Sequence, residues 1–210
     1  IHQYSLPVKY FIINNSNKEK NMSITSLSLA GRSLLFAQLS SIAYLPQAKA
    51  TKEARALGFT TTEFYNKSGA QAYRFQSKDD LVIACRGTQP TEFGDIQADL
   101  KAYPVIAETV SRVHRGFKTE VDDLWPAIQE DILRKANMAS RCKHDSELGN
   151  PVMLFTYGSP KVGWKGYCNS LNVVHHRWKN NNDIVTTVPL TMMGYKHHGT
   201  EHYINAYGQV

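Results

Sequence analysis

The chain has 210 residues, enough for one mid-sized domain with a buried core. Hydrophobic residues make up 42% and charged residues 20%, which is ordinary for a globular protein, and the formal net charge is +6. The basic residues form no stripe interleaved with aromatic residues, which disfavours nucleic-acid binding and makes an anionic lipid or membrane surface the better partner. Every apolar run is too short to span a membrane.

The three cysteines Cys85, Cys142 and Cys168 are an odd number without paired spacing. This pattern excludes a disulfide framework or a zinc cluster and favours buried thiols in a reducing compartment. A stretch resembling a signal cleavage site ends at Ala50, but the residues before it carry Arg32 and have helical rather than uniform apolarity. We therefore expect a cytoplasmic location.

The first predicted element is a helix. Residues 1–21 show no sustained period, and we expect them to be an unpatterned, disordered leader outside the fold. Apolar residues then recur at helical spacing over 26–45, and Pro46 ends this amphipathic helix.

Strands and helices alternate through the rest of the chain. Strands are predicted over 59–65, 70–76, 81–86, 152–158 and 173–179, and helices over 93–103 and 116–135. Several of these strands are short apolar runs, as expected of strands buried on both faces. The alternation predicts an α/β fold, a mostly parallel sheet flanked by helices, in one domain over residues 23–210.

Two strand ends carry candidate catalytic groups. Asp183 follows the strand over 173–179, and a carboxylate at such an edge can orient a catalytic histidine, although a turn-capping role is the more common one. Thr88 follows the strand that ends in "CRG", where a backbone N–H and a hydroxyl can face an oxyanion, although an ordinary turn has the same pattern.

The other possible catalytic or metal-binding residues are better explained by structural roles. His114 near a helix start is more often a packed residue than a base, and Ser159 before Pro160 lacks the G-x-S-x-G form of a nucleophile. The spacing of His198 and His202 suits a metal only on a helix, which Gly199 opposes, so we expect no metal site.

Seven motifs follow one another along the chain: "ARALGF", "GAQAYRF", "ACRGTQPTEFGDIQADL", "VHRGFKTEVDDLWPAI", "FTYGSPKVG", "HHRWKNNNDIVTTVP" and "MGYKHHGTEHYINAYG". Together they resemble the class 3 lipase family, the fungal-lipase-like branch of the α/β-hydrolases, and most closely its bacterial members. The resemblance implies hydrolysis of carboxylic esters, typically acylglycerols, without a cofactor. It assigns Asp183 to the triad acid and Thr88 to the oxyanion hole.

The chain departs from the family at the nucleophile. The family places its serine in a "GHSLGG"-like elbow within the interval that here runs from Phe117 to Thr156, and no such elbow occurs in it. The join falls near Asn137, so a strand, a turn and part of a helix, roughly twenty residues, are missing from the domain. We expect the strands that flank this gap to lose ladder partners and the fold to be marginally stable.

The catalytic base also departs from the family pattern. His197 matches a histidine of the family's "YxHxGxE" motif that is not the catalytic one, and the usual base lies further downstream, so His197 is at most a stand-in. The resemblance therefore implies a lipase-family protein that is catalytically defective as written. The alternatives are a non-catalytic protein that binds lipids or partners, and weak hydrolysis through Ser159 or Ser140 with His197 or His198 as base.

Overall fold

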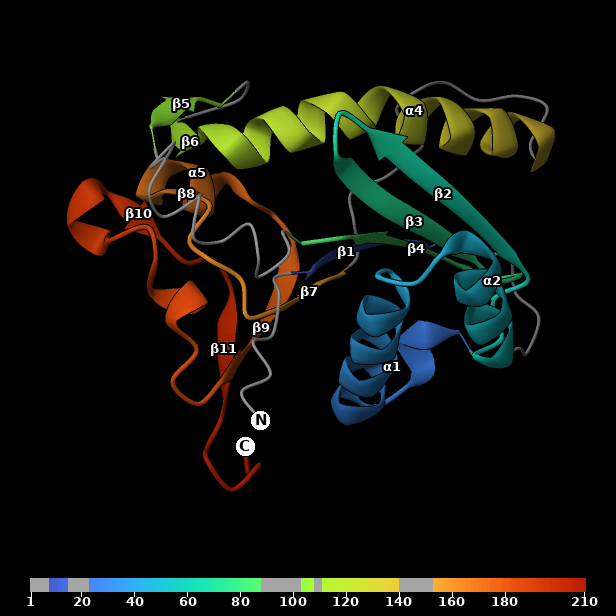
Figure 1. Cartoon of the computed structure of the whole chain (residues 1–210), viewed down its shortest axis with the longest axis horizontal. Coiled ribbons are helices and arrows are strands. Elements are labelled where there is room, and N and C mark those ends of the chain that lie inside the picture. The colour runs from blue at the N-terminus through green and yellow to red at the C-terminus, as the bar shows by residue number, and fades with distance from the viewer. Residues whose placement is uncertain (1–7, 15–22, 88–102, 108–110, 140–152) are drawn as a thin grey trace.

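The computed structural model describes residues 8–14, 23–87, 103–107, 111–139 and 153–210 (Figure 1). The helices are α1 (Leu29–Ile42), α2 (Gln47–Ala56), α4 (Arg115–Ala139) and α5 (Lys165–Ser170), with short 3₁₀ turns η1 (Ile24–Ser26), η3 (Ile184–Thr187) and η4 (Thr191–Met193). The strands are β1 (Val8–Asn14), β2 (Thr61–Lys67), β3 (Ala70–Gln76), β4 (Asp80–Cys85), β5 (Pro104–Ile106), β6 (Arg112–His114), β7 (Met153–Tyr157), β8 (Gly163–Trp164), β9 (Val174–Asn180), β10 (Tyr195–Lys196) and β11 (Thr200–Ile204).

A seven-stranded sheet in the order β11-β9-β7-β1-β4-β3-β2 forms the centre of the molecule. The pairs β7·β9 and β9·β11 are parallel, whereas β1 is antiparallel to both β4 and β7, and β3 is antiparallel to both β2 and β4. Hence β2, β4, β7, β9 and β11 point one way, and β1 and β3 point the other way. A smaller sheet, β10-β8-β6-β5, lies beside α5.

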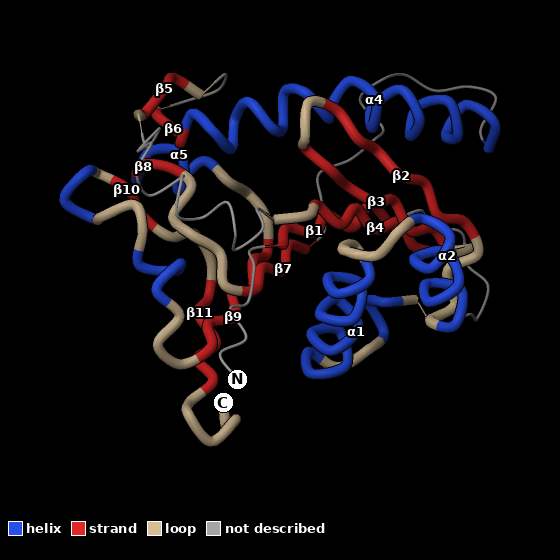
Figure 2. Tube along the Cα trace, in the orientation of Figure 1, coloured by secondary structure: helices blue, strands red, loops and turns tan. Residues whose placement is uncertain are grey.

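Helices cover both faces of the large sheet, which confirms the predicted α/β architecture. The sheet is mixed rather than mostly parallel, because β1 and β3 run opposite to the other strands. Figure 2 shows α1 and α2 on one side of the sheet and α4 on the other. Side chains alternate between the two faces of a strand, and β3 shows this directly. Tyr73 and Phe75 face the α1 side, while Ala72 faces Leu124 and Ile128 of α4.

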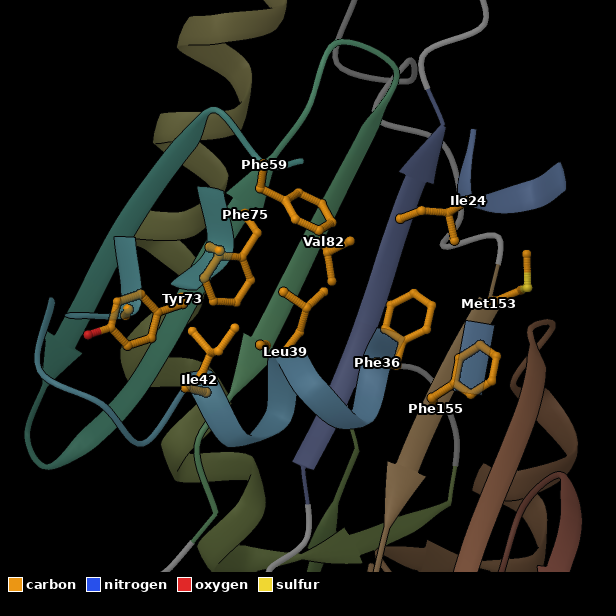
Figure 3. Close-up of a cluster of buried hydrophobic side chains, with 14 residues drawn as sticks. Ile24, Phe36, Leu39, Ile42, Phe59, Tyr73, Phe75, Val82, Met153 and Phe155 are labelled. Atoms are coloured by element: carbon orange, nitrogen blue, oxygen red, sulfur yellow. The ribbon is translucent and has the colours of Figure 1, made fainter. Parts of the chain in front are cut away.

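The larger core cluster lies under α1. Phe36 of α1 stacks on Phe155 of β7, with ring centroids 4.6 Å apart, and both rings are fully buried (Figure 3). Leu39 of the same helix is also fully buried and lies beside Val82 of β4 in the cluster. A stacked aromatic pair adds about 0.5–1.5 kcal/mol beyond its area burial, so this contact fixes α1 over the centre of the sheet.

Strand β1 occupies a position that the sequence does not predict. Residues 8–14 pair with β4 over the whole strand, and residues 8–9 also pair with β7. The expectation that residues 1–21 lie outside the fold is therefore wrong for Val8–Asn14, a short apolar run of the kind that suits a buried strand. It is also wrong that the strands on either side of the gap lack partners, because β1 pairs with both β4 and β7.

Most of the predicted elements are confirmed within a few residues. The helix over 116–135 is α4, the helix over 26–45 contains α1, and the five predicted strands are β2, β3, β4, β7 and β9. The helix predicted over 93–103 lies outside the described residues. The position near Asn137, where the sequence places the join, lies inside α4, which continues to Ala139 without a break. Among the described helices, none combines the length and apolarity that crossing a membrane requires.

Candidate functional site

The carboxyl ends of β4, β7 and β9 meet at one edge of the large sheet. Lys9 of β1 is paired with Cys85 at the end of β4 on one side and with Thr156 near the end of β7 on the other. The Gly158 amide, just after β7, donates to the Trp178 carbonyl of β9 at 2.9 Å. The segments that follow these strands therefore share the edge where α/β sheets bind ligands.

Asp183 begins the 3₁₀ turn η3 just after β9. Its Oδ1 accepts a hydrogen bond from the Val185 amide at 3.0 Å, so the carboxylate caps its own turn. Its Oδ2 is buried and has no hydrogen-bond partner among the described residues. Burial raises the pKa of this carboxyl, against the lowering effects of the Val185 amide and of Lys179. The chain thus presents one satisfied and one unsatisfied carboxylate oxygen at the sheet edge.

His197 lies against the same turn without reaching the carboxylate. Its Nε2 is 2.7 Å from the Thr186 carbonyl oxygen, and the Thr186 hydroxyl donates to the Asp183 carbonyl at 2.8 Å. A carbonyl only accepts, so Nε2 carries the proton and Nδ1 holds the lone pair. Burial, with smaller contributions from Arg177 and Lys161, lowers the pKa of His197 to about 4, although the Thr186 carbonyl and Glu201 oppose the shift. The ring is therefore neutral at pH 7 and a weak base.

Thr88 lies outside the described residues, but the residues before it are described. The Gly87 amide donates to the Tyr44 hydroxyl at 2.9 Å, and the Arg86 guanidinium lies 5.0 Å from the centre of the Tyr44 ring. Tyr44 follows α1, and the sequence patterns do not single it out. The Gly87 amide is therefore already hydrogen-bonded, and its partner Tyr44 connects the turn after β4 to the residues that follow α1.

The other candidates from the sequence have structural environments. Ser159 is 4% exposed, and its hydroxyl donates to the Pro160 carbonyl, which agrees with the structural interpretation of this residue. The His114 ring packs against Phe117 at 4.5 Å between centroids. Ser140 lies outside the described residues.

The histidines near the C-terminus do not lie on a helix. His198 precedes β11 and His202 lies within it, and each ring pairs with a histidine of β9: His198 with His175, and His202 with His176. The adjacent histidines "HH" at 175–176 are visible in the sequence, but only the β9·β11 register shows that they face the later ones. In the described part of the chain, no group of three or more potential ligands could hold a metal ion.

An exposed apolar segment lies beside the candidate site. Between Ile184 and Met193, four large apolar side chains face solvent: Ile184 (55% exposed), Leu190 (52%), Met192 (88%) and Met193 (39%). Lys161 holds this segment, because its ammonium group donates to the Thr187 carbonyl and to the Pro189 carbonyl. Burial lowers the pKa of Lys161, and nearby positive side chains, Lys179 and Lys196 among them, add to the effect. We call Ile184–Met193 with Lys179 and Lys196 the apolar-basic segment.

Solved structures of lipases share this fold. A triacylglycerol lipase with a serine protease triad superposes with a TM-score of 0.66 at 18% identity, over 92% of this chain and 83% of that one. The triacylglyceride lipase of Rhizomucor miehei gives 0.64 at 16% identity, over 93% and 84% of the two chains. Lipase II from Rhizopus niveus gives 0.62 at 19% identity, over 94% and 85%. The chain therefore has the fold of the fungal triacylglycerol lipases.

Sequence comparison with curated proteins also finds a distant relative. Toxin TseL of Vibrio cholerae is 29% identical over 117 residues, a match that spans 47% of this chain and 18% of the toxin. The chain thus corresponds to less than a fifth of that protein. No family model matches the sequence.

Proposed function

We propose that this chain binds acyl lipids at a lipid surface and does not hydrolyse them through a serine nucleophile. The observation that carries the proposal is the absence of any G-x-S-x-G sequence from a chain with the lipase fold. Acyl transfer through a serine needs the nucleophile and a base in contact with it. Without them, hydrolysis by direct attack of water is slower by orders of magnitude.

The arrangement around Asp183 supports this proposal. The resemblance assigns Asp183 to the triad acid, whose task is to orient an imidazole. The described residues instead leave Oδ2 without a partner, and His197 donates to the Thr186 carbonyl. His197 is a poor stand-in for the base because it is neutral with a pKa of about 4, well below the range that suits a general base at pH 7.

The apolar-basic segment supports a lipid partner. Exposed apolar side chains next to lysines are the combination that anchors a protein to an anionic lipid surface, because the apolar groups enter the interface and the cations contact the headgroups. The segment begins immediately after Asp183, so docking would bring the candidate site to the lipid. The solved structures that share this fold include triacylglycerol lipases, which favours acylglycerols as the lipid class.

Vesicle co-sedimentation tests this proposal. The purified chain is mixed with vesicles of phosphatidylcholine alone or of phosphatidylcholine with phosphatidylglycerol, each with or without dioleoylglycerol. We expect binding to anionic vesicles that strengthens with dioleoylglycerol and weakens with added salt. Met192→Asp should lower the binding constant about tenfold, since burying such a side chain is worth about 1.5–3 kcal/mol.

Leu34→Asp is the matched control, because Leu34 is 62% exposed but lies on α1, which Figure 1 shows apart from the apolar-basic segment. It should bind vesicles as the unchanged chain does. A chain that is folded by circular dichroism and sediments with none of these vesicles would show that the proposal is wrong.

A further inference from the structure

Two pairs of histidines connect β9 to β11 and to the residues just before it. The Nδ1 atoms of His175 and His198 are 3.1 Å apart, and the rings stack with centroids 5.3 Å apart. The Nδ1 of His176 is 2.9 Å from the Nε2 of His202. His175 and His176 are neighbours on a strand, so the two pairs lie on opposite faces of the sheet. Neither pair has a role in the function proposed above.

The His175–His198 pair has a partner behind each ring. The Nε2 of His175 is 3.0 Å from the hydroxyl of Thr156, a residue of β7 that is 1% exposed. The His198 ring donates a hydrogen bond to the Leu171 carbonyl, a contact that raises its pKa against the lowering effect of burial. With Nδ1 directed at His175, this donor is Nε2, which leaves a lone pair on the His198 Nδ1.

Each imidazole has a second hydrogen-bond partner behind it, as metal-binding histidines do. When the His175 Nε2–H donates a hydrogen bond to the Thr156 hydroxyl, the His175 Nδ1 carries a lone pair as the His198 Nδ1 does, and these two nitrogens lie 3.1 Å apart. Metal-bound imidazoles almost always donate their second N–H to a carbonyl, hydroxyl or carboxylate in this way. Two imidazoles bound to Zn²⁺ at about 2.0–2.1 Å in tetrahedral geometry place their nitrogens about 3.3 Å apart, close to the separation observed here.

Gly199 permits this close approach. Its φ is +80°, a conformation that other residues rarely adopt, and a Cβ at this position would collide with the backbone oxygen and the Cβ of His175. Gly199 thus allows His198 to lie against β9, immediately before the chain enters β11 and pairs with the same strand.

We propose that His175 and His198 form a two-histidine site for a divalent transition-metal ion, with water completing the coordination shell. Imidazole ligands suit Zn²⁺, Cu²⁺ and Ni²⁺ rather than Mg²⁺ or Ca²⁺, which prefer oxygen. Bound metal ties the residues that precede β11 to β9 and so stabilises the edge of the sheet next to the candidate site.

The second pair is a built-in comparison. Burial lowers the pKa of His176, and His202 and the positive charge of Arg32 add to the effect. A positive charge at this place also repels a metal cation. The His202 ring also stacks on Trp178 with centroids 4.6 Å apart. We therefore assign the metal to the His175–His198 pair alone.

Isothermal titration of the purified chain with Zn²⁺ tests this inference, with Mg²⁺ as the comparison ion. We expect one saturable Zn²⁺ site and no binding of Mg²⁺. His175→Gln and His198→Gln should each weaken Zn²⁺ binding by at least about tenfold, and Thr156→Val by about tenfold, since partners behind metal ligands are typically worth 10–100-fold. His202→Gln, the matched control on the other face, should bind as the unchanged chain does.

Two further measurements distinguish the loss of a Zn²⁺ site from a general loss of structure in the variants. Zn²⁺ should raise the melting temperature of the unchanged chain and of His202→Gln, but not that of His198→Gln. Binding should weaken as the pH falls through the titration of the imidazoles, because protons compete for the lone pairs. No saturable Zn²⁺ binding, or equal binding by a folded His198→Gln variant, would overturn the inference.

Discussion

Burial of the His197 ring ties the protonation of one side chain to the stability of the fold. The pKa of this ring falls to about 4 in the folded state, mainly because burial disfavours the charged form. An unfolded chain would titrate it near the ordinary histidine value, about 6.5. Because the folded pKa is the lower one, the contribution to stability is fully present above the unfolded value. It is lost as the pH falls through the folded value.

His197→Gln should remove this dependence. Glutamine can still donate to the Thr186 carbonyl but does not titrate, so the variant should lose less stability than the unchanged chain between pH 6.5 and pH 4. The difference is at most about 3 kcal/mol, from the size of the shift. Denaturant unfolding at several pH values measures it. Parallel stability curves for the two proteins over this range would contradict the assignment.

At the residue scale, the sequence predicts where candidate site residues lie along the chain better than it predicts which residues they contact. Asp183 lies where the strand-then-turn pattern places it, and it also makes the capping contact that such a turn residue commonly makes. The pairing of His175 with His198 depends on the parallel register of β9 and β11, which no local pattern encodes. The strand β11 itself is too short and polar to be recognised by its period.

A buried ion pair anchors helix α4 to the sheet. Arg74 of β3 is fully buried, and its Nε donates to Oδ2 of Asp131 at 2.6 Å. The Tyr65 hydroxyl donates to the same oxygen at 2.6 Å, and Gln76 accepts from the Arg74 Nη1. Strands β2 and β3 and helix α4 therefore meet at one carboxylate, next to the apolar contacts of the same helix.

Asp131→Asn should destabilise the fold by about 3 kcal/mol, because it leaves the Arg74 charge buried without a counter-ion. Asp122 is the matched control on the same helix: it pairs with Lys118 at the surface, and Asp122→Asn should cost less than about 1 kcal/mol. Chemical denaturation of both variants measures the contrast. Equal losses from both substitutions would show that the buried pair does not anchor the helix.

Strand β1 closes the centre of the sheet in an unusual orientation. It lies between β4 and β7, which are parallel to each other, and runs antiparallel to both. Its last residue, Asn14, pairs with Asp80, and the Asp80 carboxylate accepts from the Ser23 hydroxyl and the Ile24 amide. Both ends of the connection between β1 and η1 thus meet at one aspartate.

Removing residues 1–22 should leave facing edges of β4 and β7 without a partner. We expect a loss of at least about 3 kcal/mol, from several buried hydrogen bonds at roughly 1 kcal/mol each, and aggregation through the open edges. Thermal unfolding and light scattering measure both effects. A synthetic peptide of residues 7–15 should restore stability, and the same peptide with Ile12→Pro should not. A truncated chain as stable as the full one would contradict this role for β1.

At the element scale, long periodic segments are predictable and short or irregular ones are not. The strands β4, β7 and β9 and the helix α4 have strong patterns, and the structure has them within a few residues of the predicted bounds. The helix α2 contains mainly alanine and charged residues, so its apolar period is weak, yet Ala50 and Ala54 are fully buried. The sequence does not predict strand β1, because its place in the sheet depends on β4 and β7, which are distant in the sequence.

At the scale of the whole molecule, the lipase fold is shown and the loss of serine chemistry is our proposal. The chain superposes on triacylglycerol lipases over more than nine-tenths of its length, although fewer than one residue in five is identical in those structures. A fold can be shared by chains with so few identical residues, whereas a catalytic site depends on particular side chains. The central claim is that this lipase fold acts on lipids by binding and not by serine chemistry.

Labelling with a fluorophosphonate probe tests this claim most directly. The probe forms a covalent bond with activated serines, and intact-mass spectrometry of folded protein measures the stoichiometry, with a fungal triacylglycerol lipase as the positive control. We predict no stoichiometric adduct, and hydrolysis of a nitrophenyl ester at the rate of buffer alone. A stoichiometric adduct on one serine, with ester hydrolysis that disappears when that serine is replaced by alanine, would contradict the claim.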